Sequence, residues 1–327
     1  MAELLEGVIF ILVAAFFQGT FALFLKFKSN WKWENFWAIF SVIALVISPI
    51  LFSFFLVPSF LAILLSSPAS AIYNSFICGV LWGIGSVLFG LSIARIGLAL
   101  TYSLIIGLTA AVGSLLPLLL APLPNLGVLA LFATGILIMF LGLAVSAYAG
   151  MKRETEQKNR KFRLGLLLAV ISGLTSPMLN IGFVYGIPIV ETAQTHGITE
   201  FATLPVWIIV LLGGFLINFG YATYLLIKAK TFKLFAQKTK TPLILSITSG
   251  IFYFSGLSIY GIASSRLDTL GTSVGWALLM SLMIVISNLS GILTGEWTGS
   301  RKALRFQLTS ISILILGISV MGISVYL

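Results

Sequence analysis

Apolar residues run through this chain in ten long stretches, which short polar segments separate. Each stretch has about 20 residues or more, the length that a helix needs to cross a hydrocarbon core of roughly 30 Å. Continuous apolar runs of this length are typical of membrane-spanning helices. The pattern therefore predicts an all-α polytopic membrane protein with ten transmembrane helices. The predicted spans are 4–26, 36–57, 72–94, 97–119, 126–149, 164–186, 204–228, 242–263, 270–293 and 305–326.

A stretch in the first half of the chain returns in the second half without a gap. GVLWGIGSVLFGLSIARIGLALT at 79–101 aligns with GIFYFSGLSIYGIASSRLDTLGT at 250–272 when 171 is added to each number. Large aromatic residues recur between the glycines, since Trp82 aligns with Tyr253. The match predicts an internal duplication. The identical pairs are Gly79 and Gly250, Gly85 and Gly256, Gly90 and Gly261, Arg95 and Arg266, and Thr101 and Thr272.

The basic residues indicate how the chain is oriented. The chain has 19 Lys and Arg against 9 Asp and Glu, and 18 of the 19 lie in the loops that follow the odd-numbered spans, with Arg266 as the exception. Because cytoplasmic loops are enriched in Lys and Arg, both termini are predicted on the non-cytoplasmic side of the bacterial cytoplasmic (inner) membrane. The net charge of +10 therefore reports topology and does not point to a nucleic-acid partner.

The hydrophilic segment 151–163 divides the spans into two groups of five. We expect an N-terminal five-helix repeat at 1–150, a cytoplasmic connector at 151–163 and a C-terminal five-helix repeat at 164–327. An odd number of spans inverts the second repeat relative to the first. Two inverted repeats of related sequence can exchange conformations, which gives an outward-open and an inward-open state. The pattern therefore predicts alternating access.

Composition excludes several functions. The chain is 59% hydrophobic and 9% charged, far from the usual composition of a soluble domain. It has one cysteine, Cys78, and one histidine, so it has no internal disulfide, and we expect no metal site and no cofactor. It also has no phosphate-binding loop and no serine-nucleophile elbow. We therefore expect a protein that is not an enzyme and that uses an energy source other than nucleotide hydrolysis.

The polar residues within the spans indicate the kind of substrate. No charged residue lies in the middle third of any span, which disfavours an organic ion. Amide and hydroxyl side chains can bind the hydroxyls of a neutral molecule, and aromatic rings can cover its C–H surface. Interhelical hydrogen bonds and packing are the alternative role for these side chains. The predicted substrate-binding residues are Gln18, Trp82, Tyr102, Thr175, Asn180, Asn218, Tyr253 and Trp276.

The candidates for proton coupling are the carboxylates near the span ends, Glu3, Glu6, Asp268 and Glu296. Asp268 stands two residues after Arg266, so an ion pair or simple solvation is the alternative for it. Glu296 lies in LTGEW near Arg301, where it could balance the basic charge. Burial by a moving helix would shift the pKa of either acid.

Three tryptophans gather in the first basic loop, LKFKSNWKWENFW. Trp31, Trp33 and Trp37 alternate there with lysines. Tryptophans and lysines are typical of the headgroup region, so we expect these residues to anchor the loop at the lipid surface.

Three stretches resemble the bacterial L-rhamnose/proton symporters, a ten-helix branch of the drug/metabolite transporter superfamily. They are FLKFKSNWKWENFWAIF at 24–40, GVLWGIGSVLFGLSIARIGLAL at 79–100 and LTGEW at 293–297. The resemblance implies import of a 6-deoxyhexose with a proton, through a cavity between the two five-helix halves. It also implies that the first four helices of each half line the cavity and that the fifth packs outside it.

These observations predict a secondary active transporter of L-rhamnose or a related neutral sugar, with the proton as coupling ion and the lipid bilayer as its surroundings. A facilitator or exporter of small neutral or amphipathic metabolites or drugs is the alternative within transport. A membrane sensor or scaffold that does not transport is the alternative of another class, although a scaffold has no need of two exchangeable halves.

Overall fold

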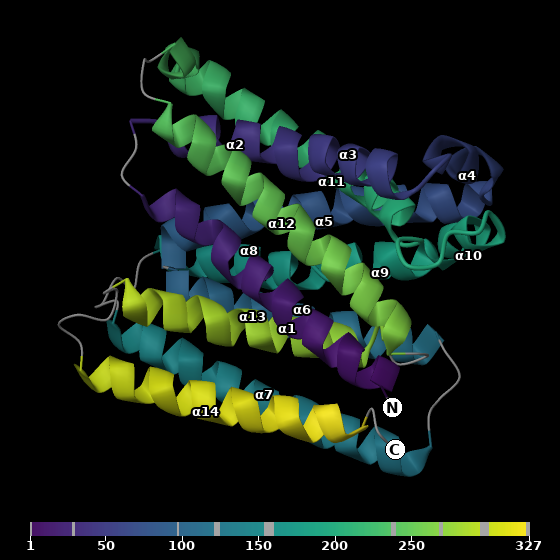
Figure 1. The fold of residues 1–327 in the computed structure, drawn as a ribbon. Coiled ribbons are helices and arrows are strands. Elements are labelled where there is room, and N and C mark those ends of the chain that lie inside the picture. Colours follow the sequence, from purple (N-terminus) through teal and green to yellow (C-terminus); the bar gives the residue numbers. More distant parts are fainter. Residues whose placement is uncertain are drawn as a thin grey trace. The chain divides into compact units, whose positions relative to one another are not determined.

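The computed structural model describes residues 2–27, 30–96, 98–120, 125–153, 160–236, 240–267, 271–294 and 301–324, and the regular elements within these ranges are helices (Figure 1). The elements are α1 (Ala2–Thr20), η1 (Phe21–Lys26), α2 (Trp33–Val42), η2 (Ile43–Ile47), α3 (Ser48–Leu56), α4 (Phe60–Ser66), α5 (Ala69–Ile96), α6 (Leu98–Leu120), α7 (Leu126–Arg153), α8 (Arg160–Thr175), α9 (Met178–Tyr185), α10 (Ile187–Thr195), α11 (Leu204–Ala229), η3 (Phe232–Ala236), α12 (Thr241–Arg266), α13 (Val274–Leu293) and α14 (Arg301–Ser324).

Nine helical segments in the described ranges are long and apolar enough to cross a membrane. Two of them join several elements: α2, η2 and α3 form the segment Trp33–Leu56, and Arg163–Thr195 contains most of α8 together with α9 and α10. A shorter apolar stretch, Leu104–Pro117, belongs to α6, where the fourth of the ten spans is predicted. The all-α polytopic class is confirmed, and the count of ten stays a prediction.

The chain divides by its contacts into two compact units, and each unit draws on both halves of the sequence. Unit 1 comprises Met1–Gly19, Gly85–Pro177 and Ala263–Leu327, and unit 2 comprises Thr20–Ile84 and Met178–Ile262. This division cuts across the predicted repeats, whose boundaries come from the order of spans along the chain. The internal duplication, with one repeat at 1–150 and the other at 164–327, stays a prediction.

The chain leaves one unit and enters the other at four points. Each point lies within a helix or between two consecutive helices. The first is at Gly19, where α1 gives way to the 3₁₀ turn η1, and the second follows Ile84 within α5. The third follows Pro177, between α8 and α9, where proline lacks the N–H that would continue a helix. The fourth follows Ile262 near the end of α12. These helices are the first and third spans of each predicted half.

Glycines bring the helices of unit 2 into close contact. A Cβ atom on Gly79 of α5 would overlap the carbonyl oxygen of Val210 in α11, and one on Gly213 of α11 would overlap the carbonyl oxygen of Phe76. Small residues allow such close approach of membrane helices. The repeat partner Gly250 has a similar place, because its Cβ would lie 2.9 Å from the Ile43 Cβ at the start of the π-helical turn η2. Each repeat glycine therefore packs against the second span of the other predicted half.

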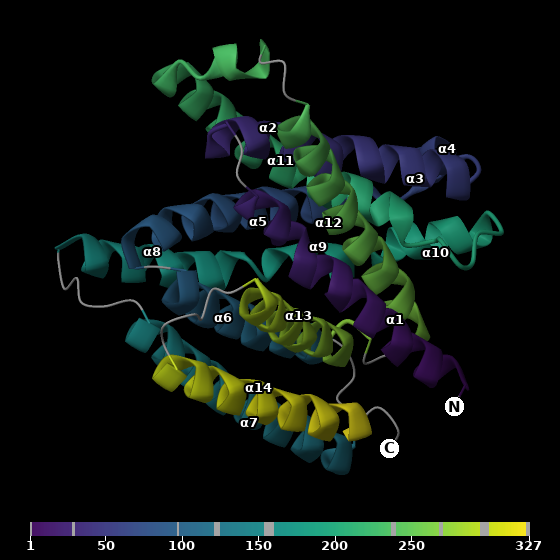
Figure 2. The same cartoon turned by 60° about the vertical axis from the view of Figure 1, so that its left-hand side comes forward.

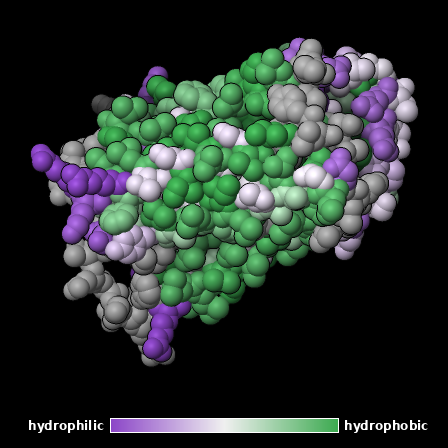
Figure 3. All heavy atoms as spheres, turned by 90° about the horizontal axis from the view of Figure 1, so that it is seen from below, coloured by the Kyte–Doolittle hydropathy of each residue, from purple (hydrophilic) through white to green (hydrophobic). Residues whose placement is uncertain are grey.

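In unit 1, α7 and α14 pack along each other and lie side by side in both views (Figure 1 and Figure 2). Buried polar contacts join them: Ser310 Oγ donates to the Gly142 carbonyl at 2.7 Å, and Ser146 Oγ donates to Gln307 Oε1 at 3.2 Å. Figure 3 shows apolar side chains across the middle of the face on the side of α7 and α14, with hydrophilic residues at its ends. This distribution suits a lipid-facing surface. Exposed apolar residues of the two helices include Leu137, Leu141, Leu316 and Ile323.

Candidate functional site

Two predicted site residues in unit 2, Trp82 and Tyr253, contact each other directly. Their rings are stacked, with centroids 6.2 Å apart and an interplanar angle of 20°. Trp82 comes from α5 and Tyr253 from α12, and the two are matched positions of the repeat. Residues that a twofold axis relates contact each other only where they lie close to that axis. The pair therefore marks the place in unit 2 where an axis relating the two copies would pass.

Three further aromatic residues surround this pair. Tyr253 makes edge contacts with Phe21 and Phe40, at centroid distances of 5.0 and 5.5 Å, and Phe40 lies 4.7 Å from Trp37. A glycine makes room for the tryptophan, because a Cβ on Gly214 of α11 would overlap the Trp82 ring. We call this group the central aromatic cluster; it consists of Phe21, Trp37, Phe40, Trp82 and Tyr253.

Asn218 of α11 is hydrogen-bonded to the central aromatic cluster. The indole N–H of Trp37 donates to Asn218 Oδ1 at 3.0 Å, and Asn218 Nδ2 donates to the Gly214 carbonyl at 3.0 Å. Asn218 is buried, so these bonds fix the orientation of its amide. The structure thus places Trp37 against a predicted site residue, whereas the sequence pattern assigned Trp37 to the headgroup region. The spacing of Trp33, Trp37 and Phe40 along one face of α2 was the signal for this contact.

Asn180 of α9 belongs to a second aromatic cluster in unit 2. The Tyr260 hydroxyl donates to Asn180 Oδ1 at 2.7 Å, and both residues are fully buried. The Tyr260 ring lies 5.9 Å from Phe183 and 6.3 Å from Trp207, which stack on each other at 4.8 Å. Tyr260 lies two turns after Tyr253 on one face of α12, so α12 carries residues of both clusters. Sequence reasoning did not select Tyr260, Phe183 or Trp207 as site residues.

Unit 1 contains the other four predicted site residues. Gln18 is buried near the end of α1, and Trp276 of α13 is buried with its N–H donating to the Thr109 carbonyl at 3.2 Å. The Thr175 hydroxyl donates to the carbonyl of Ile171, one turn earlier in α8, at 2.9 Å. Tyr102 lies in α6, and its side chain is outside the described residues. The single cavity that would join these residues with those of unit 2 stays a prediction.

Of the carboxylates predicted for proton coupling, Glu3 and Glu6 lie in α1, and Asp268 and Glu296 lie outside the described residues. Within the described ranges, no group of three or more His, Cys, Asp or Glu could hold a metal ion. A salt bridge joins Arg266 to Glu6 of α1, although the sequence pattern associated Arg266 with Asp268.

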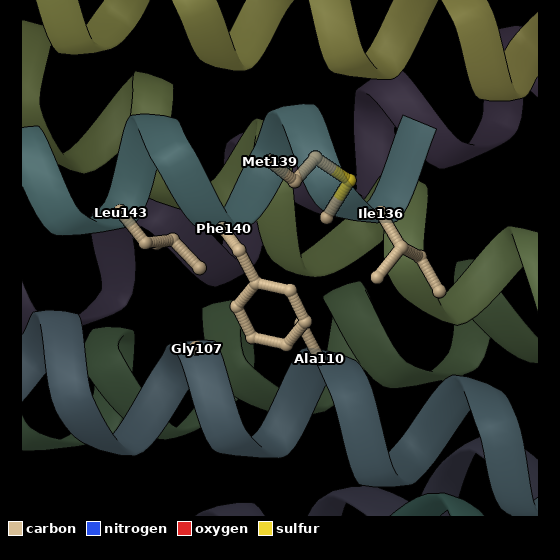
Figure 4. Close-up of a pocket in the computed structure, with 6 residues that line it drawn as sticks. All are labelled: Gly107, Ala110, Ile136, Met139, Phe140 and Leu143. Atoms are coloured by element: carbon tan, nitrogen blue, oxygen red, sulfur yellow. The ribbon is translucent and has the colours of Figure 1, made fainter. Parts of the chain in front are cut away.

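A small pocket lies between α6 and α7 of unit 1, and Figure 4 shows Phe140 pointing from α7 towards α6. Its volume is about 10 Å³, and its walls are apolar. It offers no hydrogen-bond partner and no room for a sugar. The lining residues are Gly107, Ala110, Ile136, Met139, Phe140 and Leu143.

Replacing Tyr260 with Phe tests the second aromatic cluster. The change removes the hydroxyl that donates to Asn180 and leaves a buried carbonyl oxygen with one bond fewer. A hydrogen bond contributes about 0.5–1.5 kcal/mol to stability, and hydrogen bonds between membrane helices average at the lower end of this range. We expect the melting temperature of the purified protein to fall by about 2–6 °C. The double variant with Asn180→Leu should recover part of this loss, and a Tyr260→Phe protein as stable as the wild type would contradict the assignment.

An all-helical membrane protein whose interior combines aromatic rings with buried amides has the construction of a transporter of small neutral molecules. The chain belongs to the L-rhamnose-proton symport protein (RhaT) family, whose model matches residues 1–326. The protein is therefore a transporter and not an enzyme. The resemblance noted in the sequence is confirmed.

Curated relatives cover nearly the same length. An L-rhamnose-proton symporter of Cronobacter sakazakii is 27% identical over 337 residues, covering 97% of this chain and 96% of that protein. Proteins of the same name from Escherichia coli O1:K1 / APEC and Shigella dysenteriae serotype 1 are 27% and 26% identical, each covering 90% of both chains. A protein of known crystal structure matches with a TM-score of 0.64 at 14% identity, covering 97% of this chain and 96% of that one, so it shares the fold.

Proposed function

We propose that this protein imports L-rhamnose, or a closely related neutral sugar, together with a proton across the bacterial inner membrane. The observation that carries the proposal is the family match over residues 1–326. The chemistry of unit 2 agrees with such a substrate, because amides and aromatic rings suit a neutral, hydroxyl-rich molecule. Residues of that kind in unit 2 are Trp82, Asn180, Asn218 and Tyr253. The sequence also predicts a substrate-binding role for Gln18, Tyr102, Thr175 and Trp276, which belong to unit 1.

The central aromatic cluster must open to bind a sugar between its rings. A sugar held between two rings needs two carbon contacts of about 3.5–4.0 Å each, or about 7–8 Å between the rings. The Trp82 and Tyr253 centroids are 6.2 Å apart. We infer that the two rings separate when the sugar binds and close on each other again after it leaves. Asn218, held by Trp37 beside them, would then bind a sugar hydroxyl.

Alternating access by two inverted five-helix repeats is our proposed mechanism, with both termini outside the cytoplasm. Two features support it: the matched contacts of Gly79 and Gly250, and the stacking of the repeat partners Trp82 and Tyr253. In an inverted-repeat transporter the two halves exchange their conformations when the site changes sides. Asp268 and Glu296 are proposed as coupling carboxylates on the two sides.

Uptake into proteoliposomes tests the proposed function. We expect radiolabelled L-rhamnose to accumulate when the outside is acidified, and only to equilibrate without the gradient, because a symporter uses the proton gradient to concentrate its substrate. An uncoupler should abolish the accumulation. If rhamnose only equilibrates across the membrane, with or without the proton gradient, the protein is a facilitator. Protein that reconstitutes well but admits no rhamnose would overturn the substrate, and unlabelled neutral sugars added as competitors would show which sugar replaces it.

A further inference from the structure

The end of α7 and the start of α14 meet in unit 1 through two small side chains. Ala149 of α7 and Ala303 of α14 are both fully buried and belong to one packed cluster. Since α7 ends at Arg153 and α14 begins at Arg301, the last turn of one helix lies beside the first turn of the other. Both turns adjoin basic loops that the sequence predicts on the cytoplasmic side of the membrane.

Lys152 lies against two aromatic rings at this junction. Its Nζ is 5.0 Å from the centroid of the Tyr148 ring, one turn earlier on α7, and 5.1 Å from that of the Phe306 ring on α14. The two rings contact each other edge-on, with centroids 4.9 Å apart. Aromatic rings attract an ammonium group but have no net charge to neutralise it. The rings therefore hold the positive charge of Lys152 beside α14.

Three more cations lie within the first two turns of α14. Lys302 lies one turn before Phe306, and Arg305 lies one turn after Arg301. All three side chains are exposed, as is that of Lys152. Two helices thus gather four positive charges at one end of the α7–α14 pair. We call this group the basic patch; it consists of Lys152, Arg301, Lys302 and Arg305.

Carboxylates do not neutralise the basic patch within the part of the chain that the structure describes. No salt bridge among the described residues involves the patch, and α7 and α14 themselves contain no Asp or Glu. The acidic residues nearest to it in the sequence, Glu154 and Glu296, lie outside the described residues. Exposed cations that cluster at the end of a membrane helix attract anionic groups. The basic patch therefore suits a negatively charged partner.

An exposed apolar stripe continues from the basic patch along the same two helices. On α14, Leu308 and Leu316 follow Arg305 on the exposed side. On α7, Leu141 precedes Tyr148 by two turns, and both side chains are exposed. Figure 3 shows that this face is apolar across its middle and hydrophilic at its ends. A phospholipid has the same order, since its charged headgroup lies at the surface and its acyl chains lie in the hydrocarbon core.

We propose that the basic patch binds the phosphate headgroup of an anionic phospholipid, whose acyl chains lie along the exposed stripe of α7 and α14. Lysine and arginine both donate hydrogen bonds to phosphate oxygens, and the guanidinium group can bind two oxygens at once. Because the cations come from both helices, one headgroup joins α7 to α14. This site does not depend on which sugar the protein transports.

Charge selects an anionic lipid over the other partners that could cover this face. A zwitterionic lipid brings an ammonium group of its own, which the basic patch repels. A second copy of this chain, seated on the same face, would bring a second basic patch to the same side of the membrane. Like charges brought together in this way oppose such a contact.

A titration of the purified protein with palmitoyl-oleoyl phosphatidylglycerol, in a nonionic detergent, tests the site. We expect the melting temperature to rise by about 2–5 °C, because a ligand that binds only the folded protein stabilises it. The corresponding phosphatidylcholine should give a smaller rise. The triple variant Arg301→Gln, Lys302→Gln and Arg305→Gln should need about fivefold more phosphatidylglycerol for each charge removed to reach half of the effect. A triple variant with the wild-type titration would overturn the proposal.

A second triple variant is the matched control, because it removes the same charge from the end of α11 and from η3 in unit 2. It changes Lys228, Lys230 and Lys233 to Gln, and all three are exposed. It should keep the wild-type titration. If it weakens binding as much as the α14 variant does, net charge attracts the lipid and the proposed site fails. The single change Lys152→Gln, on α7, should weaken binding by about fivefold and tests the patch without altering α14.

Two further measurements distinguish the lipid from other occupants. Glycerol 3-phosphate has a phosphate group without acyl chains, so it should not raise the melting temperature; an equal rise would mean a soluble phosphorylated ligand. Leu141→Cys places a thiol on the exposed stripe, while the native Cys78 is buried. Oxidation in proteoliposomes of phosphatidylethanolamine and phosphatidylglycerol should leave this variant monomeric. A cross-linked dimer would mean that a second copy covers the stripe, and it would overturn the lipid site.

Discussion

Replacing Trp82 with Ala is expected to weaken rhamnose transport by about tenfold to a hundredfold in apparent KM. Trp82 stacks on Tyr253 in the central aromatic cluster, and its indole offers a large aromatic face to a sugar. Losing the contact area of one large side chain costs about 1.5–3 kcal/mol, and each 1.4 kcal/mol is a factor of ten in affinity. Uptake measured over a range of rhamnose concentrations, at matched amounts of protein in the membrane, checks this value.

Two other variants separate a binding role of Trp82 from a packing role. Trp82→Phe keeps a ring face, so its KM should fall between those of the wild type and Trp82→Ala. Trp31→Ala is the matched control, because Trp31 is also in unit 2 but packs on Phe235 and donates to the Leu234 carbonyl near η3. That variant should keep the wild-type KM. If Trp82→Ala also keeps it, the central aromatic cluster does not bind the sugar.

Replacing Gly79 with Ala should have the largest effect on stability. The added Cβ would overlap the carbonyl oxygen of Val210, which is backbone and cannot rotate away. α5 and α11 must then separate, and the Gly83 and Gly213 contacts along the same interface are lost with them. Overpacking of this kind costs about 1–3 kcal/mol or more. We expect a melting temperature at least about 5 °C lower and a reduced yield of folded protein.

Gly220→Ala is the matched control for this change. Gly220 also lies in α11 of unit 2, and among the described residues no atom outside its own helix backbone lies within 4 Å of the position its Cβ would take. The same substitution should therefore leave the yield and the melting temperature unchanged. If the two variants lose stability equally, the effect comes from replacing a helical glycine as such and not from the α5–α11 contact.

The sequence by itself determined the class of protein, an all-α polytopic membrane protein. A hydrocarbon core demands long uninterrupted apolar runs, and every backbone polar group within it must be paired inside a helix, so the spans can be recognised one by one. The resemblance to the family was also recognised from local motifs, such as those at 24–40 and 79–100. The repeat stays a prediction from local motifs, and the close helix approaches at Gly79 and Gly250 agree with it.

Only the tertiary structure decided which of these residues meet. Trp82 and Tyr253 are 171 positions apart, and Trp37 and Asn218 are 181 apart, so no local pattern could show that they contact each other. Tyr260 and Trp207 were not selected as site residues, because a single aromatic residue in a membrane helix carries no sign of its neighbours. Arg266 was associated with Asp268, two residues away, whereas the fold brought it to Glu6, 260 residues earlier. Contacts between distant helices depend on how the helices pack, and a pattern along one helix records only which face is apolar.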